Sequence, residues 1–192
     1  MKSEMRLAPG QSPRLAPLES RSRLDPSPGP RLAPLAGSQL AILRTLAHDE
    51  PLLAPFLGWA AALAGRGALP RRDSELLALR AAWNCRSEYE WGHHVEYARR
   101  AGLSEAEISR VAEDPETDGW SERDRLLLRA ADELHATQRL ADVTWAALRA
   151  LFSDAQLVEI PLVVGHYTML SMLANATGVP LAPGLPALPS ER

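Results

Sequence analysis

Apolar residues recur at intervals of three and four positions through most of the chain after about residue 37. This spacing places them on one face of an α-helix, and no stretch shows the sustained alternation, bounded by hairpin turns, that strands would need. The pattern predicts an all-α fold of about 7–8 helices. The expected helices begin near residues 38, 51, 73, 87, 104, 121, 142 and 154.

Helix-capping residues precede several of these segments. Asp73 is expected to cap the third helix, Ser104 pairs with Glu107 in a capping box, and Ser121 begins the helix after it. Pro161 lies within the last long apolar run, and its missing N–H predicts a kink there. The caps therefore predict helix starts, and Pro161 predicts an interruption.

Proline divides the chain into three parts. Residues 1–36 and 179–192 are rich in proline, which is excluded from helix interiors, so we expect an N-terminal arm and a C-terminal tail around a helical domain at 37–178. The phrase Arg-Leu-Ala-Pro occurs three times in the arm, which is too little for a solenoid. Two interpretations of the arm remain: a flexible leader of biased composition, or a segment that lies across a neighbouring subunit.

Composition narrows the class of protein. The chain has 192 residues and 46% apolar residues, which suits one folded domain with tails. Its formal net charge of −3 gives no general attraction to nucleic acid or to an anionic membrane. The start has no apolar signal-peptide core, and Cys85, the one cysteine, fits a reducing compartment. We expect a cytoplasmic protein that binds neither nucleic acid nor membrane.

One helical stripe combines polar and aromatic side chains. At 100° per residue, Ser87, Glu90, Trp91 and His94 share a face, with Tyr97 at its edge. A solvated face usually lacks tryptophan and a core face usually lacks glutamate and histidine, so the mixture suggests a pocket wall. A Glu-His pair at i, i+4 can exchange a proton near neutral pH. The alternative is an ordinary solvated helix contact.

Glu75 lies one helix earlier, on a segment that the pattern predicts to be buried. A buried carboxylate needs a partner, and antiparallel packing across the bend at residues 84–86 could supply His94. His166 and Tyr167 interrupt the last apolar helix, where they either satisfy each other in the core or reach a pocket.

Metal binding and thiol chemistry are not expected from the spacing. His93 and His94 are adjacent, so they point about 100° apart on a helix and rarely bind one ion together. Cys85 lies off the stripe of Ser87 and His94, which favours a buried structural thiol. We expect no metal and no other cofactor.

The arrangement of Glu75 followed twelve residues later by Ser87-Glu-Tyr-Glu-Trp-Gly-His-His94 resembles the carboxymuconolactone decarboxylase family, which includes the alkyl hydroperoxidase D-like proteins. Residues 31–35, 101–105 and 131–135 also resemble this family, so the similarity covers about residues 30–180. The resemblance implies an alkyl hydroperoxidase D-like helical bundle that assembles as trimers or hexamers, with the active site near subunit contacts.

The peroxidase branch of the family carries a glutamate followed by Cys-x-x-Cys-x-x-x-His. These positions match Glu75, Ser87, Glu90 and His94, so both cysteines are absent. Thiol peroxidase chemistry needs a thiolate to attack the peroxide, which makes it doubtful in this chain. The decarboxylase branch lacks the cysteine pair too and uses acid–base groups without a cofactor, although this chain is longer than the simple decarboxylases.

Three functions follow as hypotheses. The first is a cofactor-free lyase or isomerase acting on a small carbonyl acid or lactone. In that hypothesis His94 is the general acid and base, Glu90 and Glu75 are its partners, Ser87 donates a hydrogen bond, and the substrate is contacted by Trp83, Trp91, Tyr97, His166 and Tyr167. The second is antioxidant chemistry through Cys85, and the third is a non-catalytic oligomeric protein that binds a small ligand.

Self-association is also expected from the helices themselves. Residues 51–63 and 154–174 are apolar over more than one helical face, which a monomer of this size can hardly cover. We therefore expect a homotrimer or a homohexamer.

Overall fold

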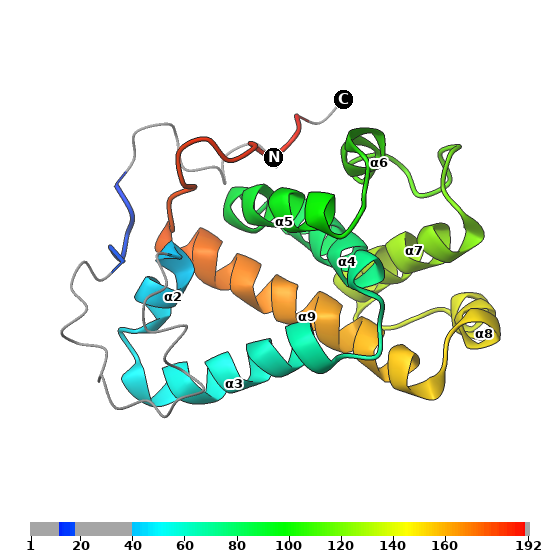
Figure 1. The fold of residues 1–192 in the computed structure, drawn as a ribbon, viewed down its shortest axis with the longest axis horizontal. Helices are drawn as coiled ribbons and strands as arrows, with labels where there is room; N and C mark the ends of the chain where they lie inside the picture. Colours follow the sequence, from blue (N-terminus) through cyan, green and yellow to red (C-terminus); the bar gives the residue numbers. More distant parts are fainter. Residues whose placement is uncertain (1–11, 18–39, 191–192) are drawn as a thin grey trace. The chain divides into compact units, whose positions relative to one another are not determined.

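The computed structural model describes residues 12–17 and 40–190, and over these ranges it contains helices and no strand. The eight helices are α2 (Ala41–Leu46), α3 (Glu50–Arg66), α4 (Arg71–Asn84), α5 (Glu88–Arg100), α6 (Glu105–Arg110), α7 (Glu122–Thr137), α8 (Asp142–Leu151) and α9 (Asp154–Thr177), as Figure 1 shows. The all-α prediction is confirmed. Most of the predicted N-terminal arm, at 1–36, lies outside the described residues.

Contacts divide the chain into two compact units. One comprises residues 1–66 with 173–180, and the other comprises 67–172 with 181–192, so the predicted domain at 37–178 contributes to both. Within the first unit, the Leu15 amide donates to the Thr177 carbonyl at 3.1 Å, and a ring nitrogen of His48 lies 3.0 Å from the Ala16 carbonyl. The described piece of the arm is therefore tied to the end of α9.

The core of the second unit is α4, which packs against both α5 and α7. Leu76, Leu77 and Leu79 point in different directions from the helix axis, and all three are fully buried. From Asp73 to Trp83 the helix is buried on every side, so it has no solvated face there for its charged residues. The charged side chains of α4 that are buried must therefore be paired within the protein.

Arg80 is the clearest case of such pairing. Its guanidinium donates to both carboxylate oxygens of Asp132 at 2.6 Å and to the carbonyls of Val111 and Glu113, and only 6% of the residue is exposed. One α4 side chain thereby joins α7 to the segment that follows α6.

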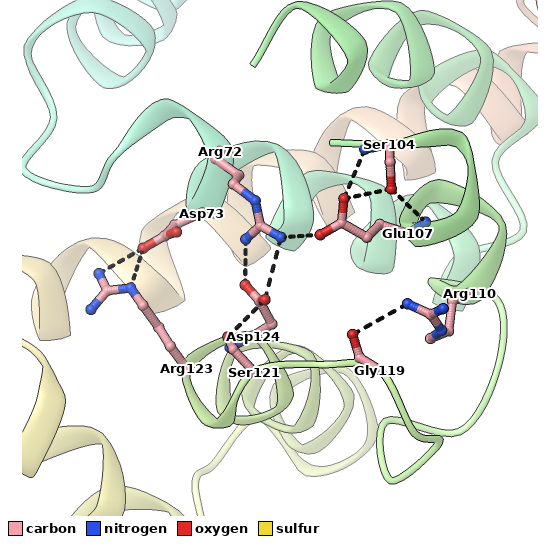
Figure 2. A network of polar contacts seen from close by, with 9 residues as sticks. All are labelled: Arg72, Asp73, Ser104, Glu107, Arg110, Gly119, Ser121, Arg123 and Asp124. Atoms are coloured by element: carbon pink, nitrogen blue, oxygen red, sulfur yellow. Dashed lines mark hydrogen bonds and ion pairs between the residues drawn. The ribbon is translucent and has the colours of Figure 1, made fainter. Parts of the chain in front are cut away.

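A second polar network joins the start of α4 to α6 and α7, as Figure 2 shows. Arg72 binds both Glu107 and Asp124. These two acids also belong to the caps of their own helices, because Glu107 bonds Ser104 and Asp124 bonds Ser121. The arginine thus fixes the beginnings of two helices against α4.

The capping predictions for α6 and α7 are confirmed. Ser104 and Glu107 form a complete capping box, and the Ser121 side chain accepts from the Asp124 amide. The prediction that Asp73 caps its helix is wrong: α4 begins after Pro70, and Asp73 lies in the first turn. Its buried carboxylate pairs with Arg123, 2.6 Å away, because a charge inside the core needs a partner.

The last helix, α9, continues through Pro161 from Asp154 to Thr177. It is long and apolar enough to cross a membrane by length and composition, but 56% of its most apolar window is buried within the protein. Its Glu159 is also buried and accepts hydrogen bonds from the Ala68 and Leu69 amides, just before α4. α9 thus serves as a core helix that also fixes the start of α4.

The C-terminal tail lies against α5. A Cβ atom placed on Gly92 would be 2.5 Å from Leu181 Cδ1 and 2.9 Å from the Pro186 carbonyl oxygen, which is closer than real atoms approach. Leu188 is only 4% exposed. The tail therefore covers the α5 surface at Gly92, and glycine is required there by this close approach.

Replacing Arg80 with methionine should destabilise the fold by about 3 kcal/mol, because Asp132 would lose its cationic partner and the Val111 and Glu113 carbonyls would lose the guanidinium donor. Urea unfolding measures this difference. Arg129→Met is the matched control, since Arg129 pairs with the half-exposed Glu116 and such pairs contribute about 0–1 kcal/mol. Equal losses in the two variants would contradict a core role for Arg80.

Candidate functional site

The centre of the site is a contact between α4 and α5. His94 Nδ1 lies 2.6 Å from Glu75 Oε2, and both side chains are buried, with Glu75 fully enclosed. The two helices reverse direction at Arg86, whose φ of 53° is left-handed, and this bend lets residues nineteen positions apart meet. The packing hypothesis for Glu75 and His94 agrees with this distance.

Glu90 lies on the other side of the imidazole. Its Oε2 is 3.6 Å from His94 Nε2, one helical turn away, and the residue is 3% exposed. Burial disfavours the charged form and raises the pKa of Glu90 from 4.5 to about 7, while the nearby charge of His94 lowers it. Near neutral pH, Glu90 therefore exists in both protonation states.

Arg71 completes the charge distribution, and it is not among the site residues predicted from the sequence. Its Nη2 lies 2.5 Å from Glu75 Oε1 in an ion pair without hydrogen-bond geometry, and its side chain is 43% exposed. The signal that could have revealed it is the i, i+4 spacing of Arg71 and Glu75 on one helix. Glu75 therefore lies between two cationic or donor groups.

Aromatic rings enclose the imidazole. The Tyr167 ring meets it edge-on with centroids 4.3 Å apart, and Tyr97 does so at 5.3 Å. Burial first, and then the charge of Glu75, raise the pKa of both phenols above the ordinary value, so both stay neutral. Tyr167 comes from α9, so three helices contribute to the site.

His166 lies next to this cluster, and the charge of His94 acts on it. It packs against Tyr167 with centroids 5.0 Å apart and is 7% exposed. Burial lowers the pKa of His166 to about 4, with a further contribution from His94, so this histidine is neutral at physiological pH. The Tyr167 ring contact of His166 is thus within its own helix.

The remaining stripe residues have structural contacts. Ser87 is fully buried and its oxygen accepts from the Glu90 amide, so it caps α5. Trp91 and Trp83 are buried with ring centroids 6.3 Å apart, and the Arg86 guanidinium lies 4.2 Å above the Trp83 ring. These side chains support the turn between α4 and α5 beside the site.

Cys85 lies apart from the imidazole of His94. Its sulfur is 3.8 Å from His135 Nδ1, and burial raises the pKa of the thiol above its usual range, although the Thr168 and Ser171 side chains act to lower it. A raised pKa reduces the thiolate fraction that peroxide chemistry requires. Among the residues that the structure describes, no group of three or more potential metal ligands is assembled.

The geometry assigns distinct capacities to the two imidazole nitrogens. Nδ1 at 2.6 Å from a carboxylate is placed to donate its hydrogen, which leaves Nε2 to exchange a proton on the Glu90 side. Ring tautomers are inferred from such partners. The arrangement can therefore transfer protons within a buried, aromatic environment.

Comparisons with solved structures identify the class of fold. A protein of unknown function from Agrobacterium tumefaciens, described as AhpD, is 24% identical with a TM-score of 0.66, over 71% of this chain and 95% of that one. An uncharacterised peroxidase-related protein from Silicibacter sp. TM1040 is 19% identical with a TM-score of 0.68, over 76% and 78%. The debrominase Bmp8, solved with 2,3,4-tribromopyrrole, is 15% identical with a TM-score of 0.68, over 88% and 91%. The chain has the alkyl hydroperoxidase D-like fold.

The family assignment comes from the sequence. Residues 51–133 match the carboxymuconolactone decarboxylase family, and this segment includes Glu75, Glu90 and His94. No curated protein matches the chain at a significant level. The segment is thus similar to the carboxymuconolactone decarboxylase family, and Cys85 is the one cysteine within it.

Glu90→Gln should remove a pH-dependent loss of stability. Because the pKa of Glu90 is raised by folding, the folded state binds more protons than the unfolded state between about pH 4.5 and 7, so wild-type stability falls as pH rises through that range. The amide does not titrate. Between about pH 4.5 and pH 8, the free energy of unfolding of the variant should therefore rise by about 3 kcal/mol relative to that of wild type.

Urea unfolding at both pH values measures the change. The control is Glu122→Gln, which removes the same charge from an exposed position on α7. A stability difference between Glu90→Gln and wild type that stays constant with pH would show that Glu90 does not titrate in this way.

Proposed function

We propose that the protein is a cofactor-free acid–base enzyme, a lyase or isomerase that acts on a small carbonyl acid or lactone. The observation that carries the proposal is a buried imidazole with a carboxylate at each nitrogen, at 2.6 Å and 3.6 Å. Glu75 orients the ring and holds the hydrogen of Nδ1, so Nε2 is the atom that exchanges protons with substrate. The family match over residues 51–133 supports this class of chemistry.

A decarboxylation illustrates what such a site would do. When an unsaturated lactone acid loses CO2, the C–C bond to the carboxylate breaks and its electron pair forms a dienolate. The site then has to supply a proton to carbon, and protonated Glu90 or the Nε2 hydrogen of His94 can do so. An isomerisation uses the same groups, with His94 first removing a proton and then returning it.

The enclosure of the site favours a small, flat substrate. His94 is surrounded by the rings of Tyr97 and Tyr167, and of these three only Tyr97 is half-buried rather than buried, so the proposed approach to the imidazole is along Tyr97. Bmp8, which shares the fold, was solved with a small planar ring. We therefore place a planar lactone or enol acid first among substrates to test.

His94→Ala should lower kcat by ~10²–10⁴-fold, since positioned acid–base groups contribute about that much. The measurement follows product formation from a panel of unsaturated lactone acids and 3-keto acids by NMR. His93→Ala is the matched control: the neighbouring histidine stacks on Tyr89 and lies on another face of α5. Equal turnover in wild type and His94→Ala, with the helical content of both retained, would reject the assignment.

Turnover should also fall as pH rises through about 7, because the proton-donating form of Glu90 is lost as its carboxyl ionises. Glu90→Gln should abolish that limb of the profile. Cys85→Ser should keep the lyase activity, whereas a thiol peroxidase would lose peroxide consumption in that variant. Specific binding of a panel compound without any product over hours would instead favour a ligand-binding role.

A further inference from the structure

An uncharged, exposed stripe runs along α9 on the side away from the site. Between residues 155 and 172 its large members are Val158, Leu162, Met169 and Met172, which are 62%, 42%, 47% and 65% exposed. Ala155 and Gly165 are exposed as well. We call these six residues the α9 seam. Such a run of exposed apolar side chains marks an interaction surface.

The spacing of the seam is that of helix pairing. Successive members are separated by three, four, three, four and three residues, which is the a and d pattern of a coiled-coil seam over ~25 Å of helix. The opposite side of the same helix, which includes Ile160, Val163 and Tyr167, is already buried within the protein. The seam is therefore a second apolar face in addition to the one that the core uses.

The sizes of the seam residues point to the partner. Consider a second copy of α9 related to the first by a two-fold axis that passes between Leu162 and Gly165. The residues that then face each other across the two copies are Ala155 and Met172, Val158 and Met169, and Leu162 and Gly165. Each pair joins a smaller residue to a larger one and an a position to a d position, as in antiparallel packing. A parallel pairing would place Gly165 opposite Gly165 and Met169 opposite Met169.

Gly165 has no structural reason to be glycine within one chain. A Cβ placed there would meet no atom within 4 Å, and it is a position inside a long helix, where glycine is unfavourable. Glycine at this position is explained if Leu162 of a second copy fills the open space beside Gly165. Small residues permit such close approach of two helices.

Charge favours the same orientation. Asp154 is exposed at the beginning of the seam, so a parallel pair would bring two aspartates together, whereas an antiparallel pair separates them by the length of the seam. A lipid surface fits less well, because α9 contains no lysine or arginine to flank the apolar face. On the order of 500 Å² is exposed on each seam, so two copies would bury on the order of 1,000 Å², the lower bound for a specific interface.

We propose that the α9 seam is a two-fold interface at which a second copy of this chain packs its own α9 antiparallel. The axis passes between Leu162 and Gly165. Such a contact is isologous, so it forms a dimer by itself or joins rings face to face, and it cannot form the interface of a lone ring of three. Because α9 also carries Tyr167, the contact would support the helix from which one wall of the site is built.

Disulfide trapping tests the orientation in the full chain with Cys85 replaced by serine. Ala155→Cys and Met172→Cys are made singly and mixed after purification, then oxidised mildly. The proposal predicts a crosslinked dimer in the mixture and none in either single variant, because equal positions are ~25 Å apart in an antiparallel pair. Crosslinking of Ala155→Cys with itself would overturn the antiparallel orientation, and no crosslink in any sample would overturn the interface.

Light scattering tests whether the contact is specific rather than merely apolar. Met169→Glu should halve the assembly mass, and its matched control, Val143→Glu at a 71% exposed position on α8, should leave the mass unchanged. Gly165→Leu should also halve the mass, although it adds apolar surface and fits within one chain, because Leu162 of the second copy needs that space. A monomeric wild type, or a mass that Gly165→Leu leaves unchanged or increases, would overturn the proposal.

Discussion

Burial of α4 from Asp73 to Trp83 is the constraint on which the rest of the structure depends. A helix without a solvated face must find a partner for each charged side chain that it places in the core. Asp73 pairs with Arg123, Arg80 with Asp132, and Glu75 with His94. These pairs join α4 to α5 and α7. The polar contacts therefore select which of the apolar helices pack against one another.

The candidate site contains one of these buried charge pairs of α4, Glu75 with His94, and its surroundings differ from those of the other pairs. The Arg80 guanidinium donates to Asp132 and to the Val111 and Glu113 carbonyls, so its hydrogen bonds are made within the protein. Glu75 and His94 differ, because a further buried carboxylate, Glu90, lies within 3.6 Å of the free side of the imidazole. The same exclusion of water that makes α4 stable raises the pKa of Glu90 into the range where a proton can be exchanged.

The absence of the cysteine pair changes what this fold can do in the present chain. The positions that carry thiols in the peroxidase pattern hold Ser87, a helix cap, and Glu90, a titrating acid. The one thiol, Cys85, lies near His135, and its pKa is raised rather than lowered. Chemistry by proton transfer is therefore better supported by these side chains than chemistry by thiolate attack.

The sequence by itself determined the helices and much of the site. Apolar periodicity and the caps at Ser104 and Ser121 depend only on neighbouring residues, so they could be predicted within a position or two. The i, i+4 relation of Glu90 and His94 is likewise a property of one helix. Glu75 was singled out because its apolar segment is predicted to be buried, and the family resemblance pointed to the same residue.

Only the tertiary structure decided which long-range partners meet. Asp73 has the sequence context of a helix cap, but it binds Arg123 because the two helices are packed together. Tyr167 contacts His94 across more than seventy residues, and Glu159 binds amides that precede α4. Local periodicity specifies which face of a helix is apolar, whereas the partner of each buried charge depends on how the faces are packed, and that is a property of the whole fold.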